Sequence, residues 1–83
     1  MKKIEVVRGE YYDSVTLMLV AKEIKRINGV VDAVLNMATE ANIDIMKAAG
    51  FEIEAGFLSP DDLLIGIDYR KDEIDKILTV IRP

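Results

Sequence analysis

The chain has 83 residues, which is enough for one domain with a single hydrophobic core and too few for two. Its net charge of −4 disfavours nucleic acid and anionic membrane surfaces as partners, whereas its 51% of hydrophobic residues predicts surplus apolar surface that lies against a partner. Cysteine and histidine are absent, which excludes disulfides, zinc sites built on these residues and catalysis by histidine, so we expect a cytoplasmic domain with no catalytic residue, metal or cofactor of its own.

The first half of the chain predicts a strand, a helix and a second strand. Lys3–Arg8 is rich in β-forming residues and is followed by a glycine, which is typical of a strand. Asp13 or Ser14 then offers a side-chain oxygen that can cap a helix running to about Ile27. An Asn-Gly pair closes that helix, and Val30–Met37 is the second strand.

The second half predicts a helix, a third strand and a last helix. Thr39 is expected to cap a helix over Glu40–Ala49, with a glycine just past its end. Leu63–Tyr69 contains a continuous apolar run, which indicates a strand buried on both faces. Apolar residues at helical spacing predict a helix over Asp72–Arg82.

The element order is therefore β-α-β-α-β-α in one domain over residues 1–83. Strands that are joined through helices are normally parallel, so we expect a small α/β fold with a mainly parallel sheet of three strands. The alternative is a ferredoxin-like α/β sandwich, which needs a fourth strand. Residues 51–58 are the one candidate for it, because Phe51, Ile53 and Ala55 alternate there with glutamates.

Two strand-to-helix turns are the candidate contact sites. In a parallel sheet both turns lie at the carboxyl edge, where open α/β folds place their ligands. Asp13, Ser14 and Thr39 are explained as helix caps, but Asn42 is a mediocre residue for a helix interior. We therefore expect Asp13, Ser14, Thr39 and Asn42 to be candidates for contact with a ligand or a partner domain.

Two further groups of residues have plainer interpretations. Met18, Met37 and Met46 fall at positions that predict core filling. The acidic residues of the last third lack the spacing of a calcium-binding loop and predict a solvated face. These acidic residues are Asp61, Asp62, Asp68, Asp72, Glu73 and Asp75.

Several short segments resemble one known family. Tyr12–Met18 and Met37–Asn42 are similar to the N-terminal region of FdrA-type acyl-CoA synthetases, which are relatives of succinyl-CoA synthetase. Ala49-Gly50 and Asp61–Ile65 resemble later pieces of the same region, in the same order. The similarity covers most of the chain, although no single motif is decisive.

The resemblance has departures and implications. Ala38 replaces a glycine of the family, and Asp61 stands where the family commonly has asparagine. The resemblance implies a non-catalytic N-terminal module of an acyl-CoA synthetase, a ligase connected with purine or allantoin breakdown and with acyl or carbamoyl transfer. The alternative is a free-standing domain that binds a small ligand, or that serves oligomerisation or regulation.

The start of the first helix predicts an interface. Val15–Ala21 contains one polar side chain, Thr16, so the helix is apolar around nearly its whole circumference. A three-stranded sheet can cover one side of it and leaves exposed the opposite side, where Met18 or Leu19 would point. We expect a homodimer, or docking on the CoA-binding and ligase domains that the resemblance implies. In the alternative, Phe51–Leu58 folds over the helix and hides it.

Overall fold

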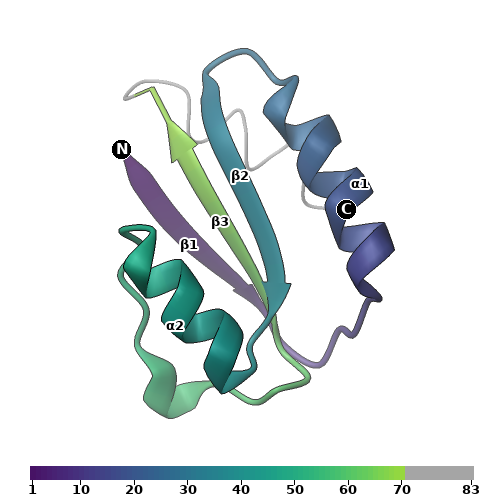
Figure 1. Ribbon diagram of the computed structural model, residues 1–83, viewed down its shortest axis with the longest axis vertical. Coiled ribbons are helices and arrows are strands. Elements are labelled where there is room, and N and C mark those ends of the chain that lie inside the picture. The colour runs from purple at the N-terminus through teal and green to yellow at the C-terminus, as the bar shows by residue number, and fades with distance from the viewer. Residues whose placement is uncertain (71–83) are drawn as a thin grey trace.

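The computed structural model describes residues 1–70 of the chain. Each predicted element in this range forms within two residues of its expected bounds, and the two later strands form as predicted. The predicted helix over Asp72–Arg82 lies outside the described residues. No helix in the described part combines the length and apolar character that crossing a membrane requires. The elements are β1 (Lys2–Val7), α1 (Ser14–Lys25), β2 (Val30–Met37), α2 (Glu40–Ala48), the short 3₁₀ helix η1 (Ala55–Phe57) and β3 (Leu63–Tyr69) (Figure 1).

The sheet is antiparallel, so the prediction of a mainly parallel sheet is wrong. The strand order is β1-β3-β2, and the last strand lies between the first two (Figure 1). Ile67 of β3 faces Lys3 on one side and Ala33 on the other, both in antiparallel register. β1 and β2 run in the same direction, as a β-α-β unit requires, but they are not neighbours.

The path of the chain after β2 explains this arrangement. α2 carries the chain back along the sheet to the start of β1, where a Cβ added to Gly50 would lie 3.3 Å from Cε of Lys2. The following segment returns to the opposite end, where the Ala38 N–H donates to the carbonyl of Asp62 at 2.8 Å. β3 therefore begins beside the end of β2 and must run antiparallel to it.

Residues 51–58 do not form the fourth strand that a ferredoxin-like sandwich needs. Gly50 has φ of +98° and ends α2, which lets the Phe51 N–H donate to the Met46 carbonyl at 3.1 Å. This cap buries the Phe51 ring against Met46 under α2. The backbone that follows is thereby held on the α2 side of the sheet, and it contains η1 instead of a strand.

The sheet has a core on each face, and this explains why nearly all of β3 is buried. Side chains alternate along β3, so Ile65 and Ile67 face α1 whereas Leu64 faces α2. The prediction of core filling holds for Met37 and Met46 but is wrong for Met18, which is exposed. The α1 core contains Leu17, Ala21, Ile24, Ala33, Leu35, Met37, Leu63, Ile65, Ile67 and Tyr69, and the α2 core contains Ala38, Ile43, Met46, Phe51 and Leu64.

Candidate docking surface

The turn between β1 and α1 uses its acidic residue as a helix cap. The Asp13 carboxylate accepts hydrogen bonds from the Thr16 N–H at 2.7 Å and from the Thr16 hydroxyl at 3.1 Å. These bonds lower the pKa of the Asp13 carboxyl below its ordinary value. Ser14 is the exposed first residue of α1. The sequence left the cap of this helix open between Asp13 and Ser14, and the structure shows that the cap is Asp13.

The turn between β2 and α2 has the same construction. The Thr39 hydroxyl accepts the Asn42 N–H at 3.2 Å, which confirms Thr39 as the cap. The half-buried Asn42 side chain donates from Nδ2 to the Met37 carbonyl at 3.0 Å. This bond ties the helix to the end of β2, so it accounts for an asparagine at this position without a ligand.

Asp62 joins the two turns, and sequence reasoning missed it. The prediction of a solvated face is wrong for this residue, which is only 4% exposed. Its carboxylate accepts the N–H groups of Gly9 and Ser59, each at 2.9 Å, and lies 3.7 Å from the Arg8 guanidinium. The hydrogen bond from the Ser59 N–H, followed by the one from the Gly9 N–H, lowers the pKa of the Asp62 carboxyl below its ordinary value. Burial acts in the opposite direction and raises the pKa, whereas the positive charge of Arg8 lowers it further. Its backbone carbonyl also holds the Ala38 N–H.

One local signal pointed to this role. Ser59 lies three residues before Asp62 in a Ser-Pro-Asp-Asp segment, which is the spacing at which the acidic side chain of a capping box reaches back to a backbone N–H. The two turns do lie at the same end of the sheet, as expected, because β1 and β2 share a direction. The helices that they begin pack on opposite faces, so Asp13 and Asn42 do not line one pocket in the described part of the chain.

A groove of about 540 Å³ lies between α1 and the sheet. Its floor is apolar, with Leu63 and Ile65 from β3 and Val20 from α1 among the lining residues. At its rim the Tyr12 hydroxyl donates to the Glu10 carboxylate at 2.8 Å. This bond and the negative charge of Glu10 raise the pKa of Tyr12, so the phenolate is disfavoured as a nucleophile.

The side chains present give little to a metal ion. Soft and borderline metals take thiolate, thioether or imidazole ligands, and the chain has no cysteine or histidine. Met37 and Met46 belong to the cores on opposite faces of the sheet, so their sulfur atoms cannot share an ion. Within residues 1–70, no three carboxylate side chains gather into a possible site for a harder cation.

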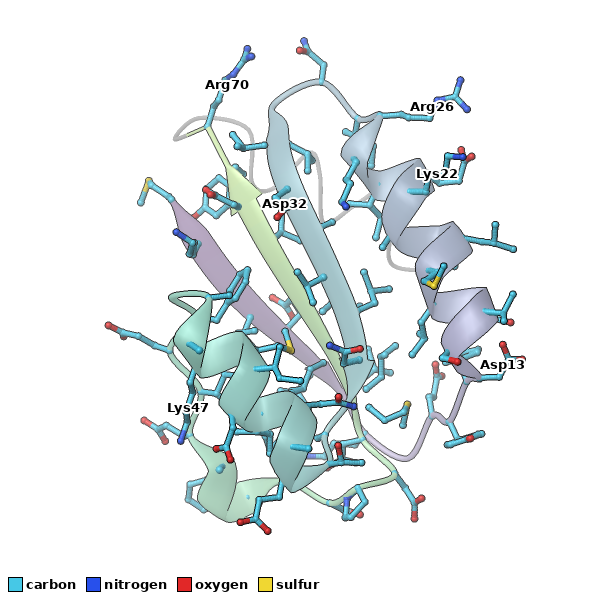
Figure 2. All side chains as sticks on the ribbon, in the orientation of Figure 1. Asp13, Lys22, Arg26, Asp32, Lys47 and Arg70 are labelled. Carbon is cyan, nitrogen blue, oxygen red and sulfur yellow. The ribbon has the colours of Figure 1, made fainter. Side chains whose placement is uncertain are left out.

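The side of α1 that faces away from the sheet exposes several large apolar side chains. We call it the outer face, and its members at helical spacing are Val15, Met18, Leu19 and Lys22. Val15, Met18 and Leu19 are 65%, 71% and 60% exposed, which confirms that apolar side chains point away from the sheet here. Residues 51–58 pack on the α2 side and do not hide them. Figure 2 shows Asp13 at one end of α1 and Lys22 towards the other.

Comparison with known proteins places the chain in a family. A family model described as "AllF, heavy metal-associated domain" matches residues 1–82, which is nearly the whole chain. No curated protein and no solved structure matches.

The match corrects the resemblance to FdrA-type acyl-CoA synthetases. That resemblance rested largely on the segments around Asp13 and Thr39, and the structure shows that both residues are helix caps. Such cap sequences recur in unrelated strand–turn–helix units because they satisfy the N–H groups at a helix start, so they discriminate poorly between families. The chain belongs to the AllF heavy metal-associated domain family.

Proposed function

We propose that this domain is a non-catalytic docking module, and that the outer face of α1 binds the surface of another protein. The observation that carries the proposal is a second apolar stripe on α1. One stripe, formed by Leu17, Ala21 and Ile24, packs on the sheet. A helix that needed only to cover the sheet would be polar on its other side, but there α1 presents Met18 and Leu19 to solvent.

The size of the apolar surface supports this proposal. Complete burial of a valine, leucine or methionine side chain contributes roughly 1.5–3 kcal/mol, and about two thirds of that remains available at Val15, Met18 and Leu19. Covering all three would therefore contribute roughly 3–6 kcal/mol before the cost of association. Tyr11, on the preceding turn, is also largely exposed and can extend the surface.

Metal binding is not part of the proposed function, although the family description names heavy metals. The thiolate and imidazole ligands that such metals prefer are absent from the chain, and the thioethers of Met37 and Met46 are separated by the sheet. Catalysis is not part of the proposed function either. The polar groups of the two turns already form hydrogen bonds that cap the two helices and fix the turn before β3. Of the residues that sequence reasoning placed at a contact site, Asp13 caps α1 and so holds the start of the helix that carries the outer face.

Oxidation of Met18 tests the proposal without knowledge of the partner. We expect mild peroxide to oxidise Met18 quickly in the dilute, purified chain, because its thioether is exposed. In the native assembly isolated from cells, Met18 should be protected. Met46, which is fully buried, provides the internal control. Trypsin cleaves after Arg8 and after Lys22, so oxidation found in the peptide 9–22 reports on Met18, its one methionine. Equally fast oxidation of Met18 in both samples would contradict docking through the outer face.

A further inference from the structure

We infer that the surface that binds the outer face is a second copy of this chain, with the two α1 helices crossing antiparallel. This inference rests on the proposed docking function and names its partner. It follows from the charges at the ends of the outer face, from the spacing of its apolar residues and from the limited area that it offers.

The charges are arranged so that an antiparallel pair is attractive. Asp13 lies at the N-terminal end of α1, and Lys22 and Arg26 lie towards its C-terminal end (Figure 2). Arg26 pairs with Glu23 at 3.5 Å, but the Lys22 ammonium makes no ion pair within residues 1–70. Antiparallel helices bring Lys22 towards Asp13 of the second copy, whereas parallel helices would place Lys22 beside Lys22.

The local attraction matters because the whole chain is acidic. Two copies with a net charge of −4 repel each other at long range, so association needs opposite charges at the contact itself. The helix dipoles act in the same sense as these side chains, since an antiparallel pair brings opposite helix ends together. A two-fold axis makes each favourable contact occur twice.

The apolar residues fit the same geometry. Val15, Met18, Leu19 and Lys22 follow the spacing of one helical stripe, i, i+3, i+4 and i+7. A two-fold axis that passes between Met18 and Leu19 places each of these side chains against the other one in the second copy. Val15 then lies against the methylene stem of Lys22, which can cover an apolar neighbour while its ammonium stays in water.

The area of the outer face indicates a weak dimer. A typical stable interface buries about 800 Å² on each partner. α1 has 12 residues and is about 18 Å long, and only one side of it is available. We therefore expect a dissociation constant on the order of micromolar to hundreds of micromolar, so the dimer forms at high local concentration.

Sedimentation equilibrium of the purified chain tests the inference. The mass is expected to rise from that of the 9.3 kDa monomer towards twice that value as concentration increases. Met18→Lys should remove this rise, because it buries a charge at the centre of the contact. Ile45→Lys is the matched control, since Ile45 is an exposed apolar residue on α2, 60% exposed, and its change should leave association intact. Unchanged thermal melting of the dilute variants will confirm that both fold.

Disulfide trapping tests the antiparallel orientation. The chain has no cysteine, so each introduced thiol is unique. In the antiparallel pair, residue 15 of one copy lies beside residue 22 of the other, while identical positions are offset by about 10 Å along the helix, beyond the reach of a disulfide. A mixture of Val15→Cys and Lys22→Cys chains should therefore form a mixed disulfide dimer faster than either variant alone.

The outcomes separate the two proposals. A wild-type chain that stays monomeric at high concentration, or a Met18→Lys chain that associates like the wild type, would overturn the second copy as partner. Preferential disulfides between identical positions would overturn the antiparallel arrangement. Protection of Met18 in the native assembly despite a monomeric chain would leave docking intact with a different protein as the partner, whereas a fully exposed Met18 there would end the docking proposal itself.

Discussion

Replacing Gly66 with alanine should destabilise the fold, because the centre of β3 has no room for a side chain towards α2. A Cβ built on Gly66 would lie 2.9 Å from Cε of Met46 and 3.0 Å from Cε1 and Cζ of Phe51. The Met46 methyl is the end of a flexible side chain and can move. The Phe51 ring is held by the cap of α2 and is buried, so it has less freedom to retreat.

The size of the effect follows from two opposing terms. Inserting a methyl group into a packed core typically costs about 1–3 kcal/mol. Alanine restricts the unfolded chain more than glycine, which returns about 0.4–1 kcal/mol. We therefore expect Gly66→Ala to lower the free energy of unfolding by about 1–2 kcal/mol, which for a domain of this size corresponds to a fall in Tm of roughly 5–15 °C.

Urea denaturation at one fixed protein concentration will measure this loss, since any self-association would change the apparent stability. Gly56→Ala is the matched control, because a Cβ there meets nothing within 4 Å and its backbone has no positive φ. The control should be neutral or slightly stabilising. A midpoint for Gly66→Ala equal to or above that of the wild type would refute the close packing of α2 and Phe51 on β3.

Three further predictions concern the turns and the family description. Thr39→Ala should lower the free energy of unfolding by about 1 kcal/mol in thermal or urea melts, since it removes the cap that receives the Asn42 N–H; an unchanged midpoint would contradict this role. The Asp62 carboxyl has a lowered pKa in the folded chain, so its contribution to stability is complete above its ordinary pKa and is lost as pH falls through its folded pKa. Wild-type stability should therefore fall more steeply than that of Asp62→Asn in melts from pH 6 towards acid, and identical slopes would show that the carboxylate is not held as described. Titration with Zn²⁺ or Cu⁺ should give neither stoichiometric binding nor a rise in Tm, because the chain has no cysteine or histidine to bind these ions. A saturable one-to-one binding isotherm would contradict this expectation.

The local elements were predictable because their signals are local. Val30–Met37 and Leu63–Tyr69 form strands with the predicted bounds, since β-forming and apolar residues mark them along their whole length. Thr39 caps α2 as predicted, because a cap needs only the hydroxyl and an N–H three residues later. Asn42 remains a candidate for contact with a ligand or partner, although its bond to the Met37 carbonyl already accounts for it.

The environment of Asp62 was not predictable in this way. Its neighbours in the chain include another aspartate, and its acidic character indicates solvent. Its burial depends on the Gly9 N–H, which is 53 positions away and is brought to it by the sheet. Met18 shows a related limit: the sequence assigned it both to the core and to the side of the helix away from the sheet, and only the packing of α1 on the sheet decided between the two.

The sequence by itself determined where helices and strands begin and end, because caps, glycine turns and side-chain periodicity act over a few residues. Only the tertiary structure decided the direction of the sheet. A single strand has unpaired N–H and C=O groups along both edges, so its backbone can pair with a parallel or an antiparallel neighbour. The choice was made by the return of the chain after α2, which brings Asp62 beside Ala38 and starts β3 between β1 and β2. The same placement puts α2 on one face and α1 on the other, so the outer face of α1 stays in solvent.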